Sequence, residues 1–69
     1  MGYRRDEGEV VITGRIEHAT AKAYLIDTPN TREPIWLPKS QIVAQTQVGE
    51  DEWEFTITEW IAKQNGIPT

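Results

Sequence analysis

The feature that most constrains the fold is a period-two alternation of apolar and polar side chains over residues 9–19 (EVVITGRIEHA). Val10, Ile12 and Ile16 fall on one face, and the other face is mainly polar. Successive side chains of a β-strand point to opposite sides, and β-branched residues are favoured there, so this segment is predicted to be a strand. Gly14 lies on the apolar face at mid-strand, where the missing side chain predicts a bulge or a sharp bend.

The length of the chain predicts a single domain with a thin core. A chain of 69 residues buries only about 60% of its unfolded surface. It has no Cys, which excludes a disulfide framework and a thiolate metal site. Residues 1–8 (MGYRRDEG) lack apolar periodicity and are expected to form a flexible arm, with residues 9–67 as the domain. No long apolar run or signal-like start is seen, so a soluble, cytoplasmic protein is expected, without membrane contact.

Four further segments have the composition or alternation of strands: residues 20–27, 34–37, 42–48 and 53–57. In the first of them, alternation predicts that Ala21, Ala23 and Leu25 face the core and that Lys22, Tyr24 and Ile26 face outward. In the second, Ile35 and Leu37 are expected inside and Trp36 outside. In the last, Trp53, Phe55 and Ile57 alternate with polar residues and are expected in the core.

Two short helical segments are predicted. Pro38 lacks the N–H that a strand ladder needs, so residues 38–41 are expected to form one helical or 3₁₀ turn. Residues 58–65 are expected to form a C-terminal helix with Thr58 as the N-cap and Gly66 as the left-handed residue after its end. Eight residues are too few for an independent helix, so Trp60 and Ile61 are expected to pack it against the strands.

These elements predict a mainly β fold, namely a small five-stranded antiparallel barrel with a short C-terminal helix. An OB-like barrel places a helix or turn between its third and fourth strands, as residues 38–41 would here. An SH3-like barrel is the alternative, since it also combines a bent first strand with a helical turn, but places that turn between its last two strands.

Two segments carry a resemblance to a family. Residues 36–42 (WLPKSQI) and 58–63 (TEWIAK), followed by Gly66-Ile67, resemble short uncharacterised phage and prophage proteins with a W-[IL]-P-K-S-Q segment and then E-W-[IL]-A. The resemblance covers residues 10–67. It implies a viral origin, an infected bacterial host and a role near genome replication or recombination.

Charge and side-chain chemistry argue against an enzyme. The net charge is −4, and four of the acids lie in residues 50–54, which disfavours strong nonspecific nucleic-acid binding. The single His, His18, has no Ser or Asp at an informative spacing, and Ser40 lacks the glycines of a phosphate loop. The acidic run lacks the spacing of a calcium loop. Neither catalysis nor a cofactor or metal is therefore expected.

A binding surface is the remaining candidate. The predicted registers place basic and aromatic side chains on the outer face of the first three strands, with further cations on the adjoining loop and turn. They are Arg15, Lys22, Tyr24 and Trp36, flanked by Arg32 and Lys39. Such a face could bind single-stranded nucleic acid by stacking and phosphate contacts.

The alternative is a protein-interaction module or homodimer that recruits or inhibits a host or viral protein. Tyr24 and Trp36 would then be covered, or Trp36 and Ile26 would form an apolar patch. The acidic residues 50–54 could imitate nucleic acid toward a basic partner.

Overall fold

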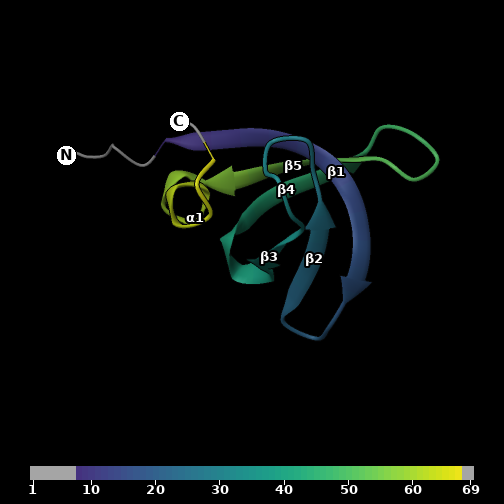
Figure 1. Ribbon diagram of the computed structural model, residues 1–69, viewed down its shortest axis with the longest axis horizontal. Helices are drawn as coiled ribbons and strands as arrows, with labels where there is room; N and C mark the ends of the chain where they lie inside the picture. Colours follow the sequence, from purple (N-terminus) through teal and green to yellow (C-terminus); the bar gives the residue numbers. More distant parts are fainter. Residues whose placement is uncertain (1–7, 68–69) are drawn as a thin grey trace.

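The computed structural model describes residues 8–67 and consists of one antiparallel sheet with a short helix at the C-terminal end (Figure 1). The expected arm at residues 1–8 therefore lies, except for Gly8, outside the described residues. The elements in chain order are β1 Glu9–Ala19, β2 Ala23–Asp27, β3 Ile35–Pro38, the 3₁₀ turn η1 Lys39–Gln41, β4 Ile42–Gln47, β5 Trp53–Thr58 and α1 Glu59–Gln64.

The long first strand organises the sheet, whose strand order is β3-β2-β1-β5-β4. Residues 9–14 of β1 pair with β5, and residues 15–19 pair with β2. The change of partner occurs directly after Gly14, and β1 curves strongly along this path (Figure 1). Of the bulge or bend predicted at Gly14, the change of partner supports the bend, and the bulge lies between Ile16 and His18, where the register shifts.

The mainly β class and the C-terminal helix are confirmed, and η1 lies between the third and fourth strands as predicted. β3 and β4 form the two edges, so the sheet is not closed by backbone hydrogen bonds. The order departs from the OB-like expectation, because β1 pairs with the fifth strand, whereas an OB barrel pairs its first strand with its fourth.

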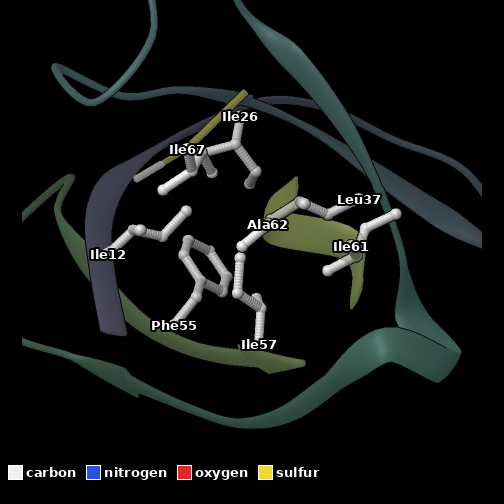
Figure 2. Close-up of a cluster of buried hydrophobic side chains, with 8 residues drawn as sticks. All are labelled: Ile12, Ile26, Leu37, Phe55, Ile57, Ile61, Ala62 and Ile67. Carbon is white, nitrogen blue, oxygen red and sulfur yellow. The ribbon is translucent and has the colours of Figure 1, made fainter. Parts of the chain in front are cut away.

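The core lies in the concave side of the curved sheet and is covered by α1 (Figure 2). Phe55 and Ile57 of β5 are fully buried, as is Leu37 of β3, which confirms the predicted inward faces of these strands. The complete buried cluster consists of Ile12, Ile26, Leu37, Phe55, Ile57, Ile61, Ala62 and Ile67.

The face of β2 was predicted the wrong way round. Ile26 is fully buried, and Tyr24 is half-buried against the core, whereas Ala21 is exposed and precedes the strand. The strand pairing accounts for the reversal: Ile26 lies opposite Ile16 of β1, and Tyr24 lies opposite the buried Leu37 of β3. Because Ile26 has no exposed surface, it cannot form the apolar patch suggested from the sequence.

Both ends of α1 have the predicted caps. The Thr58 side chain accepts a hydrogen bond from the Ile61 N–H at 3.2 Å. Gly66 has φ +74°, and the Ile67 N–H donates to the Ala62 carbonyl at 2.9 Å, which closes a Schellman motif. Ile61 packs into the core as expected, but the expectation for Trp60 is wrong, since 59% of its surface is exposed.

Candidate binding surface

An exposed tryptophan lies on the convex face of β1, β2 and β3. Trp36 is 48% exposed and faces outward as predicted. Leu25 lies opposite Trp36 in the β2–β3 ladder, and His18 lies opposite Leu25 in the β1–β2 ladder. The rings of His18 and Trp36 meet edge to face, with their centroids 6.2 Å apart. We call Trp36, Leu25, His18, Arg15 and Asp27 together the Trp36 surface.

The Trp36 surface combines an apolar centre with charges of both signs. Arg15 lies opposite Asp27 in the ladder. Its guanidinium also lies 3.8 Å from the carboxylate of Glu17. Both side chains of this ion pair are substantially exposed, so the pair contributes little to stability and leaves Arg15 accessible. Trp36 is therefore held by a neighbouring ring in a setting of roughly balanced charge.

The structure separates the six residues predicted to bind. Arg15 and Trp36 share the convex face, and Lys22 lies exposed in the β1–β2 turn next to it. Arg32 is exposed in the loop between β2 and β3. Tyr24 points to the opposite face, so its predicted outward orientation is wrong.

Tyr24 instead forms the rim of the core. Its ring lies 6.3 Å from that of Phe55, measured between centroids. The ammonium group of Lys39 lies 4.8 Å from the centroid of the Tyr24 ring, which is a cation–π geometry. The Lys39 N–H donates to the Lys22 carbonyl at 2.8 Å, which holds η1 against the β1–β2 turn. Two of the predicted cations are thus brought together at one end of the sheet.

Sequence reasoning missed His18 and Leu25. Strict alternation placed His18 at the end of the core face, but the shift after Ile16 moves it to the convex face; Leu25 lies on the convex face because β2 buries Ile26 instead. A bulge adds one residue to one strand, and the glycine at position 14 does not mark its place between Ile16 and His18. The partner residue of Trp36 therefore could not be found by counting.

A second exposed tryptophan borders a groove beside α1. The groove has a volume of about 480 Å³. Gln41 of η1 and Trp60 of α1 lie on its walls with both acidic and basic side chains. The lining residues are Gly8, Glu9, Gln41, Thr58, Glu59, Trp60 and Lys63. Sequence reasoning missed this groove because it assigned Trp60 to the core.

Within residues 8–67 no group of three or more His, Cys, Asp or Glu side chains could hold a metal ion. In the same range no helix is long and apolar enough to cross a membrane. Comparison with protein-family models, curated proteins and solved structures gave no match to this chain.

Proposed function

We propose that this protein is a non-catalytic binding module that contacts another protein through the Trp36 surface. The observation that carries the proposal is the half-exposed Trp36, whose ring lies 6.2 Å from that of His18 and beside Leu25 on the convex face of the sheet. Tryptophan and arginine are enriched at the centres of protein interfaces. A side chain held on a strand loses little conformational freedom on binding.

Charge supports a protein partner over a nucleic acid. The Trp36 surface includes Asp27 beside Arg15, and Glu17 adds a second carboxylate at 3.8 Å from that arginine. A phosphate backbone requires an excess of cations, whereas a protein interface accommodates mixed charge around an apolar centre. With Tyr24 in the rim of the core, the surface has one aromatic platform for stacking in place of two.

The two exposed tryptophans provide a matched test. Trp36→Ala is expected to abolish capture of the partner from a lysate of the bacterial host, and Trp60→Ala is expected to retain it, because the second ring lies outside the Trp36 surface. Quantitative mass spectrometry of the captured proteins measures both. A partner that is captured equally by all three forms would overturn the assignment of this surface.

Single-stranded nucleic acid is a second candidate, favoured by one observation. The 2.8 Å hydrogen bond from Lys39 to Lys22 holds two cations at the end of β2 and β3, next to the strand that carries Trp36. Titration with a short oligonucleotide at low salt tests it, because electrostatic binding is strongest there. Quenching of the tryptophan fluorescence that persists in Trp60→Phe and disappears in Trp36→Phe supports nucleic-acid binding. Unchanged fluorescence of the unmodified protein on titration excludes it.

The barrel and the origin of the chain are part of the same proposal. The curvature of β1 and the fully buried Phe55 support a partly open barrel, with η1 bridging the two edges. The β1–β5 pairing supports the SH3-like alternative, with its strands in a cyclically shifted order. The segment resemblance supports a phage accessory role in the cytoplasm of an infected bacterium.

A further inference from the structure

The two edges of the sheet differ in how they are protected. β3 has four residues and ends at Pro38, and both features discourage pairing with another strand. β4 has six residues, Ile42–Gln47, none of them charged, Pro or Gly, and residues 43–47 are all exposed. Edge strands of this length normally carry a charge or a proline that prevents association. β4 is therefore an edge that is open to pairing.

The register of β4 leaves a regular segment whose outer backbone groups are available to pair with another strand. Its only shift lies between Ile42 and Ala44, and residues 44–47 then pair regularly with β5. In the adjoining turn, the Val48 N–H donates to the Glu52 carbonyl at 2.9 Å. Alternate residues of an antiparallel strand point their backbone groups to opposite sides. Gln45 and Gln47 therefore direct their N–H and C=O groups away from β5, toward the free edge.

We propose that β4 pairs antiparallel with β4 of a second copy of this chain, around a two-fold axis at Gln45. The charges at the two ends of the strand are the reason to choose a second copy. Lys39 lies in η1, directly before the strand, and Asp51 lies in the exposed turn that follows it. Antiparallel pairing about this axis brings the acidic turn that follows β4 in each copy to the η1 end of the other copy, where Lys39 is exposed.

The neighbouring charges strengthen this match. Glu50 and Glu52 lie in the same exposed loop as Asp51, and this loop projects at one end of the molecule (Figure 1). The Lys39 side chain is exposed at the opposite end of β4. A parallel arrangement would instead place acidic loop against acidic loop, which is repulsive. Head-to-tail pairing of β4 with β3 would produce open chains of molecules, and the short, proline-ended β3 opposes it.

Charge reversal gives a sharp test, with sedimentation equilibrium as the measurement. The unmodified protein is expected to dimerise, and added salt is expected to weaken the dimer. Lys39→Glu or Asp51→Lys alone should raise the dissociation constant at least about tenfold, because each places like charges together. The double variant keeps the net charge at −4 and should restore the dimer. Arg32→Glu, which makes the same charge change as Lys39→Glu in an exposed loop, should have no effect.

A further variant tests the strand itself. Gln45→Lys places two ammonium groups opposite each other at the proposed axis and should yield a monomer with an unchanged circular-dichroism spectrum. Four results would overturn the proposal: a monomer at millimolar concentration, single reversals without effect, a double variant that stays monomeric, or assemblies larger than two copies. The Lys39 contact with Tyr24 does not confuse the outcome, because both Lys39→Glu and the double variant lose it.

Discussion

Replacing Gly14 by Ala should destabilise the protein, because this glycine allows β1 and the end of β2 to approach closely. A Cβ atom at position 14 would lie 2.7 Å from the Asp27 carbonyl oxygen and 2.7 Å from the Ile26 Cγ2. It would also lie 3.2 Å from the Thr28 Cβ, and Thr28 is itself buried. The first contact is with backbone and the second is with a fully buried side chain, so neither group can move aside freely.

The expected cost follows from these contacts. Inserting a methyl group into a packed core costs about 1–3 kcal/mol. Alanine regains about 0.5–1 kcal/mol relative to glycine through the unfolded chain. The free energy of unfolding should therefore fall by about 1–2 kcal/mol, from a total that in domains of this size rarely exceeds roughly 3–5 kcal/mol. The corresponding drop in Tm is about 5–15 °C.

A second glycine provides the control. At Gly49 the nearest neighbour of an added Cβ is the Glu52 Cβ at 3.4 Å, which is ordinary contact distance. Gly49→Ala should change the free energy of unfolding by no more than about 0.5 kcal/mol. Urea and thermal unfolding of both variants, followed by tryptophan fluorescence and circular dichroism, measure the difference. Equal stability of the two variants would refute the close approach of β1 to Asp27.

Two further predictions concern α1. Thr58→Ala removes the acceptor for the Ile61 N–H and the 2.6 Å hydrogen bond to the Gln41 side chain, and should cost about 1–2 kcal/mol in urea unfolding; Thr58→Ser should retain most of the stability. Ile61→Ala should cost about 2–5 kcal/mol, whereas Trp60→Ala should cost less than about 0.5 kcal/mol despite the larger side chain, because Trp60 is 59% exposed. A comparable loss for both would place Trp60 in the core.

Alternation predicted inward faces wherever the pairing of a strand is unbroken. In β5, Phe55 and Ile57 are buried as expected, and Ile12 occupies the core from β1. Each strand has one strongly apolar face, so the two possible orientations differ by several buried side chains. The caps at Thr58 and Gly66 were equally predictable, because each depends on local backbone geometry alone.

Alternation failed where neither face dominates or where the ladder is interrupted. In β2, Ala23 and Leu25 on one side compete with Tyr24 and Ile26 on the other, and the second pair is placed in the core opposite Leu37 and Ile16. In α1, Trp60 and Ile61 are adjacent, and six helical residues do not define one apolar stripe. Of the six residues predicted to bind, Trp36 and Arg15 therefore lie on the convex face as expected, whereas Tyr24 lies on the core side.

The two proposed interfaces use opposite edges of the sheet order. β3 carries the Trp36 surface on its convex face, and β4 would pair with a second copy. Dimerisation through β4 therefore leaves Trp36 uncovered, and one dimer presents two copies of the Trp36 surface related by a two-fold axis. Two linked sites raise the apparent affinity for a multivalent partner by about 10²–10⁴ without any new contact.

The density of the partner on a sensor surface separates the effect of avidity from that of direct contact through β4. On a sensor surface densely coated with the partner, Gln45→Lys should dissociate at least about tenfold faster than the unmodified dimer, because it binds through a single Trp36 surface. On a sparsely coated surface the two should dissociate at the same rate, since each dimer then engages one partner at a time. Trp36→Ala should lose binding at both densities. Faster dissociation of Gln45→Lys on the sparse surface would mean that β4 itself contacts the partner. The β4 edge and the Trp36 surface would then belong to one interface with the partner, and not to two separate ones.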